Sequence, residues 1–143
     1  MRTYYQSDMY ISLDAICLSP RAIAQPGSGA IACPPSLQAT RIPLQTDLGQ
    51  MERKYYHAKD FGVTDSRWRA GFDASDRAVK HVLNDPATMH IQGTYRGQPA
   101  IIDYNPKSGL CVIQTPDGRF ISGWRLNYEQ AAYVLNEGKL GGD

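Results

Sequence analysis

Apolar side chains recur every three or four residues in two stretches of the chain, which is the spacing of an amphipathic helix. The first stretch covers residues 47–58, where the side chain of Thr46 or Asp47 can cap the helix start. The second covers residues 74–84, with Asp73 as its N-cap. A proline follows two residues later and ends this helix, because the residue before proline avoids the helical conformation. The pattern predicts two consecutive helices.

The next part of the chain changes to the short alternating runs that are typical of β-strands. Short turns rich in Gly, Pro and Asn separate four such runs, and short turns connect antiparallel neighbours. A last helix begins at Asn127, which caps it while Gln130 reaches back, and it ends before Gly138. The predicted strands cover residues 88–95, 98–104, 110–115 and 119–125.

The order of these elements sets the expected fold class. Two helices, four strands and a final helix predict an α+β fold, with helices packed on a four-stranded antiparallel sheet. The expected domain is residues 46–143, where charges of both signs are frequent. Residues 1–45 hold five of the nine prolines and few charges, so we expect a Pro/Gly-rich extension or linker there.

Composition narrows the classes of protein. The 143-residue chain has 15 basic and 14 acidic residues, and a net charge of +1 is weak support for a nucleic-acid partner. No apolar run reaches the roughly 18–20 residues of a membrane span, and the start of the chain does not resemble a signal peptide. The three cysteines, Cys17, Cys33 and Cys111, form no CxxC pair. We expect reduced thiols, with a Cys17–Cys33 disulfide as the alternative, and no metal or cofactor.

The first predicted helix carries one candidate site. Lys54 and His57 are three residues apart, so both side chains project from one helix face. An imidazole transfers protons near neutral pH and an ammonium group offsets phosphate charge, which together suit attack on a phosphodiester. Arg53 and Lys59 add positive charge for RNA binding. The alternative interpretation is a solvated basic face without chemistry.

The last predicted strand carries a second candidate site. Ser122 and Trp124 are two residues apart and point to the same face, while Gly123 leaves the other face open. A hydroxyl beside an indole can bind an RNA phosphate and stack on a base, although Trp124 can equally be a core residue. Arg96 at a hairpin tip and Arg125 at the strand end are further candidates for RNA binding, or simply exposed arginines.

Four motifs occur in a fixed order along the chain and cover about residues 46–140. They are Lys54-x-x-His57-Ala58-x-Asp60-Phe61-Gly62, then Ile91–Gly97, then Asn105-Pro106, then Phe120–Trp124. As an ordered set they resemble the C-terminal nuclease domain of the colicin D family. The resemblance implies a barnase/RelE-like small ribonuclease architecture. It also implies a toxin that cuts the anticodon loop of arginine tRNAs without a metal and so stops translation.

The resemblance also implies roles for individual residues. By motif, His57 corresponds to the catalytic histidine, Lys54 to a functional lysine, and Ser122 and Trp124 to the residues that complete the site. Tyr56 departs from the family pattern, which has a second lysine at that position. We expect His57 to take the proton of a ribose 2′-hydroxyl, while Lys54 and Ser122 stabilise charge on the phosphoryl oxygens.

The expected partners follow from the same resemblance. They are tRNA as the substrate and a cognate immunity protein, expected to be acidic because it must cover the Lys54/His57 face. The expected place of action is the bacterial cytoplasm, with secretion or delivery into target cells as part of a toxin. Two alternatives stay open: an RNA- or protein-binding module that does not cut, and a ribonuclease toxin with another RNA target.

Overall fold

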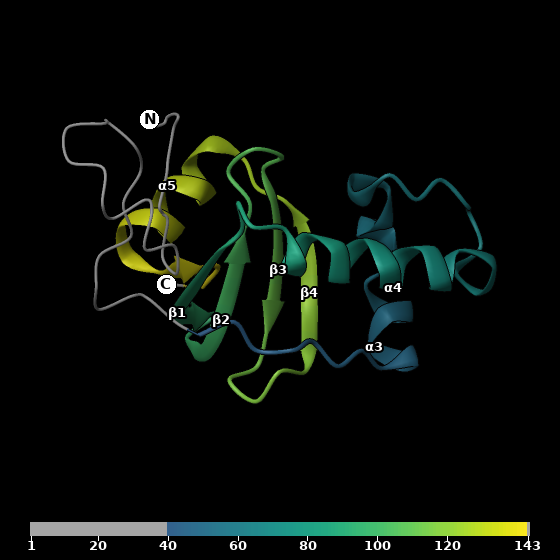
Figure 1. Ribbon diagram of the computed structural model, residues 1–143, viewed down its shortest axis with the longest axis horizontal. Coiled ribbons are helices and arrows are strands. Elements are labelled where there is room, and N and C mark those ends of the chain that lie inside the picture. Colours follow the sequence, from purple (N-terminus) through teal and green to yellow (C-terminus); the bar gives the residue numbers. More distant parts are fainter. Residues whose placement is uncertain (1–39, 143) are drawn as a thin grey trace.

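The structure is a computed structural model that describes residues 40–142. Figure 1 shows a central sheet with α5 on one side and α3 and α4 on the other, so the predicted α+β class is confirmed. The proposed extension covers residues 1–45, and residues 1–39 of it lie outside the described residues. Within residues 40–45, Leu44 is buried in the core and Gln45 forms a β-bridge with Arg119. The elements are α3 (Leu48–Arg53), the 3-10 helix η2 (Tyr55–Phe61), α4 (Trp68–Asn84), β1 (Met89–Tyr95), β2 (Gln98–Tyr104), β3 (Leu110–Gln114), β4 (Phe120–Arg125), α5 (Tyr128–Glu137) and β5 (Lys139–Leu140).

The sheet has the strand order β4-β3-β2-β1-β5. The four predicted strands are confirmed, and each pairs antiparallel with its neighbour in sequence. One strand was not predicted: β5 adds to β1 in parallel, so the sheet is mixed and five-stranded rather than four-stranded and antiparallel. Gly93 allows this close approach, because a Cβ atom there would lie 1.9 Å from the carbonyl oxygen of Gly138.

The first predicted helix is divided into two helices of different kind. Asp47 caps α3 by accepting a hydrogen bond from the backbone N–H of Gln50 at 2.9 Å. After Lys54 the chain continues in the tighter 3-10 turns of η2 and stops at Gly62, whose φ of 85° is left-handed. This change of helix type places Lys54 at the junction and His57 on η2.

The second helix, α4, starts at Trp68 instead of residue 74, so Asp73 is not its cap. Trp68 and Phe72, four residues apart and in ring contact, extend the helical spacing of Ser75 and Val79 into these first turns. Gly71 lies against the side chain of Tyr55, where a Cβ atom would be 1.9 Å from the phenol oxygen. The last helix, α5, is as predicted: Asn127 and Gln130 form a reciprocal capping box, and the left-handed Gly138 ends it.

Two apolar clusters cover opposite faces of the sheet. Ser122 and Trp124 face the α5 side, because their partners on β3 belong to the cluster under α5. Gly123 between them faces the α3 and α4 side. The α5 cluster includes Met89, Ile91, Ile102, Cys111, Ile113 and Val134, and the other includes Leu44, Met51, Val79, Val82, Val112 and Phe120.

Candidate active site at the β4 edge

The candidate site lies where α3 and η2 run along the outer edge of the sheet at β4. The side chain of Gln50 donates a hydrogen bond to the backbone oxygen of Ile121 near one end of β4. Near the other end, the backbone N–H of Arg125 donates to the carboxylate of Asp60 at 3.1 Å. His57 comes between these two anchors in sequence, so the imidazole is held against β4.

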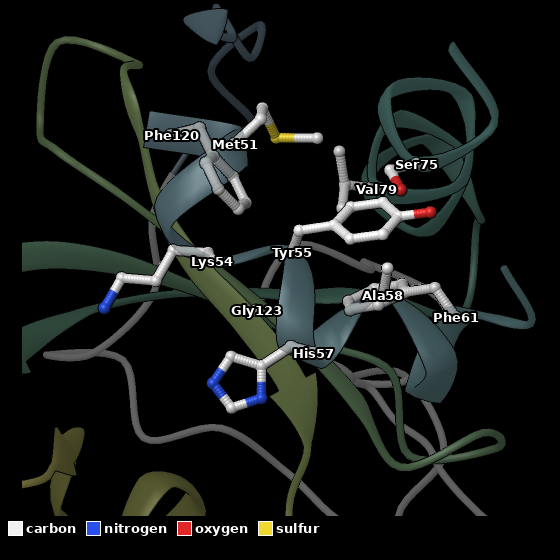
Figure 2. A pocket seen from close by; sticks show the side chains of 10 residues that line it. All are labelled: Met51, Lys54, Tyr55, His57, Ala58, Phe61, Ser75, Val79, Phe120 and Gly123. Carbon is white, nitrogen blue, oxygen red and sulfur yellow. The ribbon is translucent and has the colours of Figure 1, made fainter. Parts of the chain in front are cut away.

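The imidazole of His57 stacks on the indole of Trp124. The ring centroids are 5.4 Å apart and the planes differ by 27°. Lys54 lies one turn earlier, and its carbonyl oxygen accepts a hydrogen bond from the backbone N–H of His57 at 3.0 Å. Lys54 and His57 line one pocket, and Figure 2 shows both side chains extending away from its apolar lining. The structure therefore joins the two regions of sequence that we selected.

The surroundings of His57 favour the neutral imidazole. Burial is the largest effect and lowers the pKa of His57 below 6.5, and the charges of Lys54 and Lys59 lower it further. Asp60 acts in the opposite direction. Because only the neutral ring can accept a proton, a lowered pKa leaves more of the base available near neutral pH.

Ser122 and Trp124 share one face of β4, as predicted, but they differ in exposure. Ser122 is only 1% exposed, and its hydroxyl has no hydrogen-bond partner within residues 40–142. The pocket that Lys54 and His57 line includes Gly123 and not Ser122. Trp124 is half-buried and packs against the α5 cluster, so it is both a core residue and the stacking partner of His57.

The expected RNA-binding cations lie in different surroundings. Arg53 and Lys59 are exposed on either side of His57 along the chain. Arg96 is exposed at the β1–β2 turn, where its φ is 52°, and its guanidinium lies over the ring of Tyr95 at 5.5 Å from the centroid. These three cations are accessible to a phosphate backbone.

Arg125 is held by hydrogen bonds within the protein. Its guanidinium donates to the backbone oxygen of Asp60 at 3.1 Å and to the backbone oxygen of Ser108. The side chain thus links η2, β4 and the β2–β3 turn. In this structure Arg125 supports the site, and its expected role in RNA binding stays a prediction.

Sequence reasoning did not find the residues that position the site. Gln50 and Asp60 are bonded to partners 71 and 65 residues away, and such pairs leave no local pattern. Tyr95 was also missed: its ring lies 6.1 Å from that of Trp124, although they belong to β1 and β4. Asp60 does fall within the first motif, and that is the one sequence signal that marked it.

Other features of the described residues bear on the predicted chemistry. Within residues 40–142, no three His, Cys, Asp or Glu side chains gather in a way that would hold a metal ion. Cys111 is a free, buried thiol, and burial raises its pKa, while Cys17 and Cys33 lie outside the described residues. No helix of the described chain is long and apolar enough to cross a membrane.

Fold and site together define a class: a small α+β domain with a lysine–histidine pair at the edge strand of its sheet, stacked on an indole. The sequence model of one family, Colicin D, matches residues 50–134, which is more than half of the chain. The chain therefore belongs to the colicin D family, and the predicted family is confirmed.

Two known proteins show the extent of this similarity. Colicin-D of Escherichia coli is 35% identical over 80 residues, which are 54% of this chain and 11% of that protein. The chain thus spans about a tenth of the length of this relative. A solved structure, a ribonuclease from Escherichia coli complexed with its inhibitor protein, matches with a TM-score of 0.58 and 33% identity. That match covers 64% of this chain and 100% of the other.

Proposed function

We propose that this domain is a toxin ribonuclease that cuts tRNA in the anticodon loop, with arginine tRNAs as the first candidates. Family membership and the ribonuclease neighbour support a toxin ribonuclease. The observation that carries the proposal for this chain is the pairing of Lys54 and His57 in one pocket, with His57 stacked on Trp124. The tRNA target rests on the resemblance alone.

The proposed reaction is an attack by a ribose 2′-hydroxyl on its own 3′-phosphate. His57 accepts the hydroxyl proton, the oxygen forms a bond to phosphorus, and the bond from phosphorus to the 5′-oxygen of the next nucleotide breaks. Lys54 offsets the negative charge that builds on the phosphoryl oxygens. The leaving oxygen takes a proton from water or from Lys54, and the products are a 2′,3′-cyclic phosphate and a 5′-hydroxyl. No metal takes part in this scheme.

The buried hydroxyl of Ser122 has a defined place in this scheme. It is proposed to donate a hydrogen bond to a phosphoryl oxygen once the substrate is bound. Its lack of a partner within residues 40–142 is consistent with this role, because buried hydroxyls are usually bonded. At 1% exposure, it reaches substrate only if β4 or the adjacent side chains shift on binding.

Cleavage of purified total tRNA, followed by mapping of the fragment ends, tests the proposal. The wild type is expected to give fragments that end in a 2′,3′-cyclic phosphate, with the chelator EDTA present or absent. His57→Ala should abolish cleavage, whereas His81→Ala should cleave normally, because His81 is exposed on α4, away from β4. DNA of the same sequence should stay intact, since it has no 2′-hydroxyl.

Other outcomes of this experiment separate the competing functions. Intact tRNA that binds the protein tightly would instead indicate an RNA-binding module. Cleavage of ribosome-bound mRNA in preference to tRNA would indicate a ribonuclease toxin with another target. Equal cutting of RNA and DNA would contradict the proposed chemistry.

An immunity protein is part of the proposal, because a cell that makes such a toxin must block its site. The structural neighbour is a ribonuclease complexed with its inhibitor protein. For this chain, an acidic protein that covers Lys54, His57 and the exposed Arg53 and Lys59 is proposed. The proposed place of action is the cytoplasm of a target bacterium, after delivery as part of a larger toxin.

A further inference from the structure

Tyr56 is a large exposed aromatic residue directly beside the proposed general base. Its side chain is 64% exposed, whereas the ring of a tyrosine is usually partly buried in a folded protein. The centroids of the Tyr56 and His57 rings are 4.1 Å apart, and the planes are tilted by 41°. The reaction scheme gives this residue no role.

The rings around His57 form a continuous row. His57 makes ring contacts with both Tyr56 and Trp124, at 4.1 and 5.4 Å between centroids. The row continues from Trp124 to Tyr95 at 6.1 Å, and the guanidinium of Arg96 lies over Tyr95. It therefore leads from η2 across β4 to the β1–β2 turn. Rows of aromatic and guanidinium planes are the surfaces on which unpaired RNA bases stack.

Within this row, Tyr56 is the ring most open to an incoming base. Trp124 and Tyr95 are half-buried and pack against the α5 cluster, whereas Tyr56 is exposed. The nucleotide whose 2′-hydroxyl meets His57 carries its base on the same ribose. Tyr56, whose ring centroid is 4.1 Å from that of the imidazole, is the exposed ring nearest to such a base.

We propose that Tyr56 stacks on the base of the nucleotide at the scissile phosphate and so favours cleavage at unpaired nucleotides. This inference rests on the proposed ribonuclease function and adds a substrate contact to it. A stacked base must be unpaired, so the substrate at the cleavage site is a loop or a single strand. Stacking on tyrosine is sequence-tolerant but requires that a base be present.

The test compares Tyr56→Ala, Tyr56→Phe and the matched control Tyr133→Ala on an RNA oligonucleotide that contains the mapped cleavage site. Tyr133 is a similarly exposed tyrosine, 59%, on α5. Loss of the ring in Tyr56→Ala should raise KM about 5- to 100-fold with little change in kcat. Tyr56→Phe keeps the stacking face and should retain the wild-type KM, as should Tyr133→Ala. All variants should unfold at the wild-type temperature, because the replaced side chains are exposed.

A second substrate isolates the stacking contact. Removal of the base at the cleaved nucleotide should raise the KM of the wild type to that of Tyr56→Ala, and should leave Tyr56→Ala unaffected. Equal KM values for wild type and Tyr56→Ala, or an equal penalty for the abasic site in both, would overturn the proposal.

A binding measurement distinguishes failure of the stacking proposal from failure of the proposed ribonuclease function. The probe is the same oligonucleotide with a single 2′-deoxy substitution that blocks cleavage. If the wild type binds this probe more tightly than Tyr56→Ala but never cuts RNA, the ribonuclease function is rejected and the stacking contact is retained. If the wild type cuts RNA and both proteins bind the probe with equal affinity, only the stacking contact is rejected.

Discussion

In the proposed reaction His57 accepts a proton and must be neutral, so its pKa should set the acidic limit of activity. Burial and the charges of Lys54 and Lys59 lower this pKa below 6.5, against the opposing effect of Asp60. The neutral base therefore persists to lower pH than in a free histidine. We expect kcat/KM for RNA cleavage to rise with pH and to reach half of its plateau below pH 6.5.

The contribution of Lys59 to this limit can be measured separately. Lys59→Gln removes a cation that lowers the pKa of His57, so the midpoint of the pH–rate profile should move to higher pH. Lys107→Gln, in the exposed β2–β3 turn, is the matched control and should leave the midpoint in place. Titration of the His57 ring protons by NMR should show the same shift, and an unchanged midpoint in Lys59→Gln would refute the argument.

Single residues of the site were predictable where the signal is local. Lys54 and His57, predicted from their spacing, line one pocket, and Ser122 and Trp124 share one face of β4 as their alternation predicts. The depth of burial was not predictable. Ser122 is buried because α5 packs on that face of the sheet. The sequence of β4 does not show which helix packs on which face.

At the scale of elements, the site depends on how α3 and η2 are fixed to β4. Gln50→Ala removes the hydrogen bond to the backbone oxygen of Ile121 and should lower the free energy of unfolding by about 1 kcal/mol. Because η2 follows α3 directly, His57 should lose its exact placement, and kcat/KM should fall by up to about 100-fold.

The control for this variant is Gln92→Ala, which removes an exposed glutamine from β1. Urea denaturation and tRNA cleavage measured on both proteins separate placement from stability. Full activity in Gln50→Ala despite lower stability would show that this anchor does not position the base.

The elements themselves were predictable where a residue pattern extends over several turns or strand residues. The four long strands and α5 have clear alternation and caps, and the structure contains all of them. The early start of α4 and the two-residue β5 depend on contacts between distant segments. In both places a glycine allows the two segments to come close. Gly71 lies against the side chain of Tyr55, and Gly93 lies against the backbone of Gly138.

At the scale of the whole molecule, a buried carboxyl group that is hydrogen-bonded to an imidazole couples folding to pH. Asp103 on β2 is 0% exposed, and its carboxylate lies 2.6 Å from Nδ1 of His90 on β1. Burial raises the pKa of Asp103 from 3.8 to about 6, while the bond to His90 acts in the opposite direction. The folded protein therefore holds a proton that the unfolded chain releases between these pH values. This stabilising effect is full below about pH 4 and is lost as pH rises through about 6.

Asp103→Asn should remove this pH dependence. A shift of this size corresponds to about 3 kcal/mol between the two ends of the pH range. Relative to wild type, the variant should therefore be more stable at pH 7.5 than at pH 4.5, seen as a larger free energy of unfolding in urea denaturation. An equal difference at both pH values would rule out Asp103 as the titrating group.

The arrangement of the whole molecule was predictable only in outline. Element order indicated an α+β fold, but it did not show that η2 lies beside β4, the strand farthest from β5 in the sheet. That placement brings His57 to Trp124, which follows it by 67 positions in the chain. The family resemblance supplied the link between these segments, and the hydrogen bonds of Gln50 and Asp60 give its physical cause.

The segment that carries His57 also shields the backbone of β4 from other molecules. If α3 and η2 separated from β4 together, the proposed catalysis would stop, and the free N–H and C=O groups of β4 could pair with a neighbouring chain. Loss of activity and self-association would then have the same cause, the separation of α3 and η2 from β4. A stored sample that loses cleavage by this route would form oligomers while the rest of its sheet is still folded.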